Sequence, residues 1–205
     1  MLDVRDALLE VASIRDQIAR CVEFRGYGPT TLAVTGILAF VVASAQSAFP
    51  TERAHAIPVY IGLWTGTAAV ALTLIIIETI VRSRRIHSGL AVPMLHSALE
   101  QFLPSLVAGA LLTLVLVTCA PLTLWMLPGL WQLLFSQGVF ASRRFLPRPI
   151  FWVGVWYLAT GLACLVLGQG DRALSPWEMG IPFGLGQLLV AAVLRFGYRD
   201  ADAWA

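Results

Sequence analysis

Three side chains near the ends of apolar segments are the first candidates for chemistry. Glu78 follows a charge-free apolar run, and His96 and Glu100 are four residues apart, so a helix would place both on one face. If the run spans a membrane, placing the carboxylate of Glu78 there costs free energy, and Glu78 is therefore a functional candidate. We name as candidates for ligand binding or for proton or cation coupling Glu78, Arg82, His96, Glu100 and Gln101. The alternative for Glu78 is an ion pair with Arg82, one helical turn further on.

Other chemistry finds little support in the residue types. The 14 basic residues are all arginine, which excludes a GxxxxGK phosphate loop, a Schiff base and a Ser-Lys pair. Two ligands spaced four apart are a weak metal signal, and Cys21, Cys119 and Cys164 have no ligand spacing, so we predict no metal site. No catalytic residue can be named, an enzyme is not favoured, and any cofactor is unknown.

Composition places these residues in a membrane protein. The 205-residue chain is 58% hydrophobic and 13% charged, with a mean hydropathy of +0.78, whereas soluble domains carry roughly 25% charged residues. No Asp, Glu, Lys or Arg occurs in residues 26–51, 54–77, 101–142 or 149–170. Because a spanning helix needs about 20 such residues, several helices are expected to cross the bilayer.

These runs predict an all-α membrane protein with a six-transmembrane-helix bundle and an N-terminal cytoplasmic amphipathic helix. The helix is expected in residues 1–25, the membrane domain in 26–197 and a cytoplasmic tail in 198–205. The run 101–142 is long enough for two crossings, with Pro121 and Pro128 at the turn between them. The expected spans are about 30–49, 56–81, 101–119, 125–142, 149–168 and 179–196.

Arginine placement predicts the orientation. With both termini in the cytoplasm, twelve arginines lie inside, and only Arg53 and Arg172 lie outside. Because cytoplasmic loops carry the excess of basic residues, this bias favours a multi-pass protein of the cell inner membrane with an even number of spans.

Polar residues within the spans are candidates for lining a ligand cavity. They are Ser44, Gln46, Gln132, Ser136, Gln137 and Gln187. The alternative is that they hydrogen-bond to neighbouring helices and serve packing alone. Gly62 with Gly66, and Gly180 with Gly184, have the spacing of close helix contacts. Pro182 among glycines predicts a weakened start of the sixth span.

The N-terminal segment has an apolar stripe at helical spacing, which we interpret as a partner-docking face. The stripe consists of Val4, Leu8, Val11, Ile18 and Val22. Residues 1–24 hold five acids and three arginines, whereas helices that lie on anionic lipid are usually rich in Lys and Arg. We therefore expect it to dock on a second copy of the chain or on a cytoplasmic protein. The alternative is that it folds against the chain's own inner loops.

The sequence predicts the class of protein more sharply than its activity. The favoured hypothesis is a non-catalytic membrane module that binds or senses a small apolar molecule or a lipid and docks a partner through its N-terminal helix. The first alternative is a small secondary transporter coupled through Glu78, His96 and Glu100. The second is a membrane-integrated lipid-modifying enzyme. Direct binding of nucleic acid is not expected.

Overall fold

The computed structural model describes residues 28–49, 56–85, 91–143 and 149–203, and within these ranges it leaves out the side chains of 82–85, 91–99, 171 and 196–203. The described residues form helices and connecting turns without strands. The predicted N-terminal helix, with Val4, Leu8, Val11, Ile18 and Val22, lies outside the described residues. The predicted C-terminal tail begins inside the last helix, which runs to residue 203.

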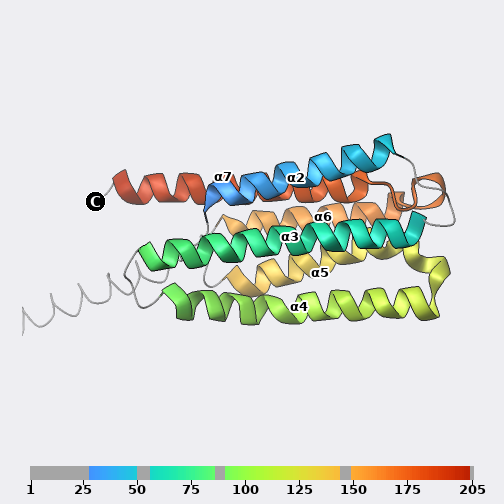
Figure 1. Cartoon of the computed structure of the whole chain (residues 1–205), viewed down its shortest axis with the longest axis horizontal. Helices are drawn as coiled ribbons and strands as arrows, with labels where there is room; N and C mark the ends of the chain where they lie inside the picture. Colours follow the sequence, from blue (N-terminus) through green and yellow to red (C-terminus); the bar gives the residue numbers. More distant parts are fainter. Residues whose placement is uncertain (1–27, 50–55, 86–90, 144–148, 204–205) are drawn as a thin grey trace, which may run out of the picture.

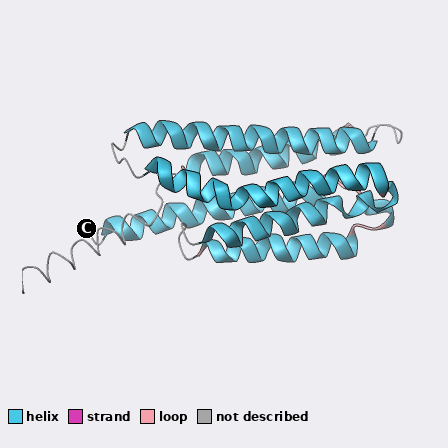
Figure 2. Cartoon of the chain, turned by 90° about the horizontal axis from the view of Figure 1, so that it is seen from below, coloured by secondary structure: helices cyan, strands magenta, loops and turns pink. Residues whose placement is uncertain are grey.

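The described part of the chain forms six α-helices, which run back and forth along one long axis (Figure 1). In chain order they are α2 (Pro29–Ala48), α3 (Ala56–Arg85), α4 (Ala91–Cys119), α5 (Leu127–Ser142), α6 (Ile150–Leu167) and α7 (Trp177–Ala203). Two short 3₁₀ helices, η1 (Pro121–Met126) and η3 (Gly170–Arg172), lie in connections at the same end of the bundle. Neighbours along the chain are antiparallel, and the long axes stay roughly aligned in both views (Figures 1 and 2).

Proline and glycine account for several helix boundaries. Pro29 occupies the first turn of α2, and Pro128 that of α5, where a missing backbone N–H costs nothing. Gly168 ends α6, and its backbone N–H donates to the carbonyl oxygen of Cys164 at 2.8 Å. These boundaries agree closely with the spans expected from the sequence.

Five helices are long and apolar enough to cross a membrane: Pro29–Ala48, Ala56–Val81, Glu100–Cys119, Ile150–Leu167 and Trp177–Arg195. Their outward surfaces are apolar; for example, Val41, Leu111 and Leu114 are more than half exposed. Contiguous exposed apolar surface on this scale is unusual for a soluble monomer. The chain is therefore a multi-pass membrane protein, and its described part is all-helical.

The closest helix pairs are α2 with α7 and α5 with α6. Glycine permits both contacts. A Cβ atom added to Gly36 would lie 2.8 Å from the carbonyl oxygen of Gly184, and one added to Gly129 would lie 2.7 Å from that of Gly161. The predicted contact role of Gly184 is thus confirmed.

Gly62 and Gly66 differ from this pattern. A Cβ atom added to either would meet nothing within 4 Å. The prediction of a close contact at this pair is wrong for the described part of the chain, because this face of α3 points away from the other described helices.

The start of the last span is not unwound, because α7 is continuous through Pro182; that this start is weakened stays a prediction. Proline lacks the N–H that would bond to the carbonyl of Glu178 four residues earlier. A side chain from another helix supplies a replacement donor, as described below.

Candidate functional site

A small cavity of about 70 Å³ lies between α2, α3 and α7. Its walls are mainly apolar, and the bulky side chains among them are Trp64, Met179 and Phe183. The lining is completed by Thr35, Ala39, Thr67, Ala68, Ala71 and Gln187. The cavity is about half the size of a ~150 Å³ apolar cavity that accommodates benzene, so it suits the end of a chain or a methyl branch.

Gln187 gives this apolar cavity one polar end. The hydroxyls of Thr35 and Thr67 donate to carbonyls of their own helices, at 2.9 and 2.7 Å. By contrast, Oε1 of Gln187 is buried and has no well-aligned partner. Tyr157 lies beside Gln187, and its ring and hydroxyl pack so tightly on Gly186 that a Cβ atom there would overlap them.

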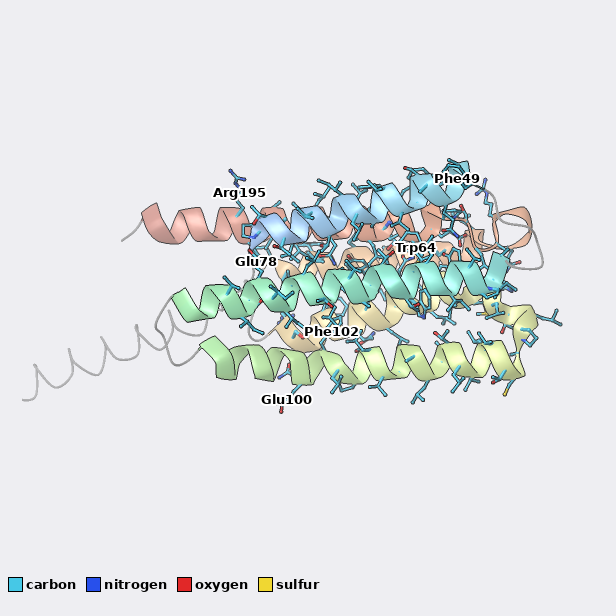
Figure 3. The ribbon with its side chains drawn as sticks, in the orientation of Figure 1. Phe49, Trp64, Glu78, Glu100, Phe102 and Arg195 are labelled. Carbon is cyan, nitrogen blue, oxygen red and sulfur yellow. The ribbon has the colours of Figure 1, made fainter. Side chains whose placement is uncertain are left out.

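Trp64 is fixed in the cavity wall by Gln46. The indole Nε1 of Trp64 donates to Oε1 of Gln46 at 3.0 Å, linking α3 to α2. Trp64 is 3% exposed and packs in a cluster with Tyr60, Ala39, Ala43 and Met179. In Figure 3, Trp64 lies between these two helices. Gln46, one of the predicted cavity residues, thus positions the cavity wall without lining it.

Aromatic rings continue from the cavity toward α4. Phe183 contacts Tyr157 and Phe135 with centroid distances of 5.2 and 5.3 Å, and Phe135 contacts Phe102 at 5.0 Å. These tilted and edge-on contacts are favourable for rings. They link α7 to α6, α5 and α4, whereas α3 has few contacts with α4.

Gln132 supplies the hydrogen bond that Pro182 removes from α7. Its Nε2 donates to the carbonyl oxygen of Glu178 at 2.8 Å and approaches Sγ of Cys164 at 3.4 Å. Gln132 is fully buried. In a membrane, a carbonyl freed by proline needs such a partner. Trp156 binds α7 one turn further on, since its Nε1 donates to the carbonyl oxygen of Pro182 at 3.0 Å.

The remaining predicted cavity residues lie elsewhere. Ser136 donates to the carbonyl oxygen of Gly154 at 2.9 Å and joins α5 to α6. Ser44 donates to the carbonyl oxygen of Phe40 in its own helix at 2.8 Å, and Gln137 is exposed. Of the six predicted cavity residues, only Gln187 lines the cavity.

Glu78 belongs to α3, and its side chain lies against the start of α2. Its carboxylate is so close to Gly28, the N-cap residue, that a Cβ atom added to Gly28 would overlap it. The N-terminus of a helix favours negative charge, so this contact gives the half-buried carboxylate a suitable environment.

The other predicted coupling residues do not gather around Glu78 in the described part of the chain. Glu100 is exposed and points away from the bundle on α4, whereas Glu78 points toward α2 (Figure 3). The side chains of Arg82 and His96 lie outside the described residues. Coupling through Glu78, His96 and Glu100 stays a prediction.

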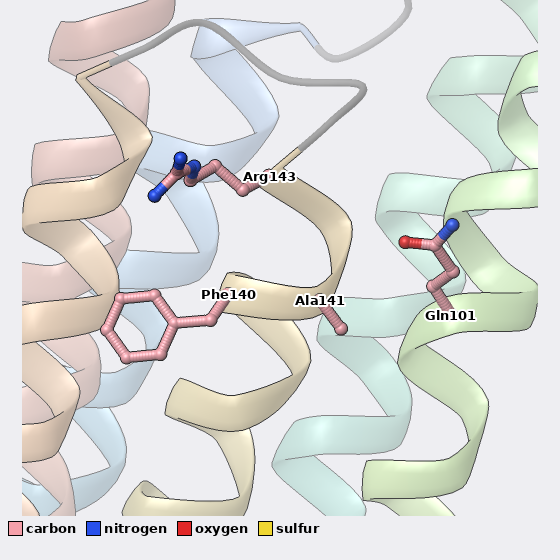
Figure 4. Close-up of a pocket in the computed structure, with 4 residues that line it drawn as sticks. All are labelled: Gln101, Phe140, Ala141 and Arg143. Atoms are coloured by element: carbon pink, nitrogen blue, oxygen red, sulfur yellow. The ribbon is translucent and has the colours of Figure 1, made fainter.

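Gln101 lines an open groove of about 470 Å³ between α4 and α5, together with Phe140, Ala141 and Arg143 (Figure 4). Arg143 lies over the ring of Phe151, 5.6 Å from its centroid. In Figure 4, Arg143 points away from Gln101. The two polar groups of the groove therefore do not converge on one ligand position.

Sequence reasoning missed Tyr60, Trp64, Cys164 and Glu178. The expected span 179–196 begins one residue after Glu178, yet Glu178 lies in the first turn of α7. The aromatic residues and the cysteine resemble ordinary core residues in an apolar span. The sequence did contain one indication of the role of Glu178. Glu178 stands four residues before Pro182, so the backbone carbonyl of Glu178 needs another hydrogen-bond donor.

Comparison with known proteins identifies no relative: no family model, no curated protein and no solved structure matches the chain. The function is therefore argued from the geometry of the described residues.

Proposed function

We propose that this protein is a non-catalytic binding module of the cell inner membrane that takes the end of an apolar chain, from a lipid or a small apolar molecule, into the cavity between α2, α3 and α7. The observation that carries the proposal is the cavity itself, with apolar walls from Trp64, Met179 and Phe183 and a single polar end at Gln187. Ligand sites typically combine a mainly apolar lining with a few placed polar groups.

The location of the cavity suits a ligand that comes from the bilayer. Ala68 and Ala71 lie beside Trp64 and Thr67 on its α3 side, and we infer that the small side chains of the two alanines leave room for a chain to enter. Helix α3 packs less extensively on its neighbours than α2 packs on α7, so α3 is the wall that can shift outward, at the cost of the hydrogen bond between Trp64 and Gln46.

A diazirine-labelled fatty acid tests this function in the full chain, reconstituted in nanodiscs. We expect light-induced adducts on Trp64, Met179 or Phe183. Ala71→Leu should fill the cavity and reduce these adducts several-fold. Ala69→Leu is the matched control, because Ala69 is exposed and does not line the cavity. Equal labelling of both variants, or adducts confined to outward-facing residues, would contradict the proposal.

The proposed topology has six spans, with both termini in the cytoplasm. Helix α5 has 16 residues, or about 24 Å at about 1.5 Å per residue, which is short for a hydrocarbon core of about 30 Å. The six residues of η1 precede it directly and add up to about 12 Å at about 2.0 Å per residue. Together they are long enough to cross.

The N-terminal stripe is proposed to dock a second copy or a cytoplasmic protein. Its support is the apolar face of Val4, Leu8, Val11, Ile18 and Val22 beside mixed charges, since a lone helix of this length is marginal in water. Removing residues 1–22 should leave the membrane domain folded in mild detergent and abolish self-association or partner capture. An unchanged oligomeric state with unchanged co-purifying proteins would contradict the docking role.

A further inference from the structure

The carboxyl group of Glu178 lies between the ends of two helices. Glu178 is in the first turn of α7, where the peptide dipoles favour negative charge. Its Oε1 lies against Gly168, the residue that ends α6: a Cβ atom added to Gly168 would lie 2.7 Å from it. The last carbonyl groups of α6 lack partners within the helix and carry negative partial charge. The α6 end therefore repels the charge that the α7 end favours.

Three buried oxygen atoms near this point have no hydrogen-bond partner among the residues that the structure describes. They are Oε2 of Glu178, Oε1 of Gln132 and the hydroxyl oxygen of Tyr60. Gln132 and Tyr60 are 0% and 1% exposed, and Tyr60 lies within electrostatic reach of Glu178. The orientation of the Gln132 amide is fixed, because its Nε2 must face the carbonyl oxygen of Glu178. Its Oε1 is left as an acceptor.

Positive charge is what this group of atoms lacks. Among the side chains that the structure describes, none forms an ion pair with Glu178, and Arg172 at the same end of the bundle is exposed. An unpaired carboxylate at low dielectric is costly. A set made of carboxylate, amide, phenol and peptide oxygens suits a hard cation rather than a transition metal. Helix C-terminal carbonyls bind Na⁺ in other membrane proteins.

We propose that Glu178, Gln132 and Tyr60, with the C-terminal carbonyl groups of α6, bind a small monovalent cation such as Na⁺ at this end of the bundle. Four helices contribute to the site: α3, α5, α6 and α7. The cation neutralises the carboxylate and separates it from the carbonyls of α6. This site goes beyond the apolar-chain function and does not depend on it.

The test is the thermal stability of the full chain in nanodiscs as NaCl replaces N-methyl-D-glucamine chloride at constant ionic strength. A ligand that binds only the folded state raises the Tm in a saturable way, so we expect a saturable rise with Na⁺. Glu178→Gln should abolish the rise, and Tyr60→Phe should shift it to several-fold higher Na⁺. Glu78→Gln is the matched control: it removes another half-buried carboxylate and should keep the full response.

Direct binding of ²²Na⁺ to the wild-type chain keeps the proposal testable if Glu178→Gln fails to fold. We expect one saturable site per chain, weakened in Tyr60→Phe. An equal Tm in both salts together with no retained ²²Na⁺ would overturn the proposal and indicate that the carboxyl is protonated instead. A full sodium response in folded Glu178→Gln would also overturn it.

Discussion

Gln132 on α5 and Pro182 on α7 form a complementary pair, because the side chain of one replaces the hydrogen bond that the backbone of the other cannot make. The shared acceptor is the carbonyl oxygen of Glu178, 2.8 Å from Nε2 of Gln132. Proline can therefore stand inside α7 without a break in the helix. The pair also fixes α5 against α7 beside the cavity.

We expect Gln132→Leu to destabilise the protein by about 1 to 3 kcal/mol, because the buried carbonyl of Glu178 loses its short amide donor and keeps only the weak thiol donor of Cys164, whose Sγ lies 3.7 Å away. In a Pro182→Ala background the cost should be smaller, since the restored backbone N–H can bond to the same carbonyl. The measurement is a double-mutant cycle of unfolding in SDS titrations. Gln137→Leu is the control, because Gln137 is exposed, and it should change stability by less than about 0.5 kcal/mol. Additive costs in the cycle would contradict the pairing.

The second prediction follows from the contact between Glu78 and Gly28. Gly28→Ala should push the carboxylate away from the α2 N-terminus, because the added Cβ atom overlaps it. Glu78→Gln keeps the shape and removes the charge, and should cost up to about 2 kcal/mol, the upper range for a partly buried charge at a helix end. Thermal unfolding in mild detergent measures both. If Arg82→Gln costs as much as Glu78→Gln, an ion pair with Arg82 is the main partner instead.

Several helix boundaries were predictable because membrane crossing leaves charge-free runs, whereas α4 begins at Ala91 and α7 runs to Ala203, both beyond the expected spans 101–119 and 179–196. The expected span 30–49 corresponds to Pro29–Ala48, and the expected span 149–168 corresponds to Ile150–Leu167. Which helices pack side by side cannot be read from the charge-free runs of a single sequence. Pairing of α2 with α7 joins segments from opposite ends of the chain, and this pairing creates the cavity.

The site residues were harder to predict for the same reason. Ser136 and Gln46 were identified from the sequence as polar groups within apolar segments, yet their partners Gly154 and Trp64 lie on other helices. Pro182 was interpreted as a weak point, because its rescue by Gln132 requires the packing of α5 on α7. A single sequence shows which polar groups need hydrogen-bond partners, but it does not show which residues supply them.

Glycine packing gives a third prediction. Gly184→Ala should destabilise by about 1 to 3 kcal/mol, because the added Cβ atom would overlap the ring of Phe40 on α2, at a distance of 2.5 Å. Gly66→Ala is the matched control: it makes the same change at a glycine with open space around it, and should leave stability unchanged or slightly raised. Unfolding in SDS titrations compares the two. Equal destabilisation would mean that the face of α3 with Gly66 is packed against another molecule.

The last prediction concerns whether α5 crosses the bilayer, which separates six spans from five. Single cysteines in a background without Cys21, Cys119 and Cys164 can be labelled in intact cells by a membrane-impermeant maleimide. Leu122 in η1 is 92% exposed and Phe49 at the end of α2 is 79% exposed, so Leu122→Cys and Phe49→Cys should both react. Arg143→Cys and Arg195→Cys at the other end should react only after permeabilisation, because the arginine-rich end is expected to lie in the cytoplasm. Labelling of Arg143→Cys in intact cells would show that α5 does not cross, and the six-span topology would be wrong.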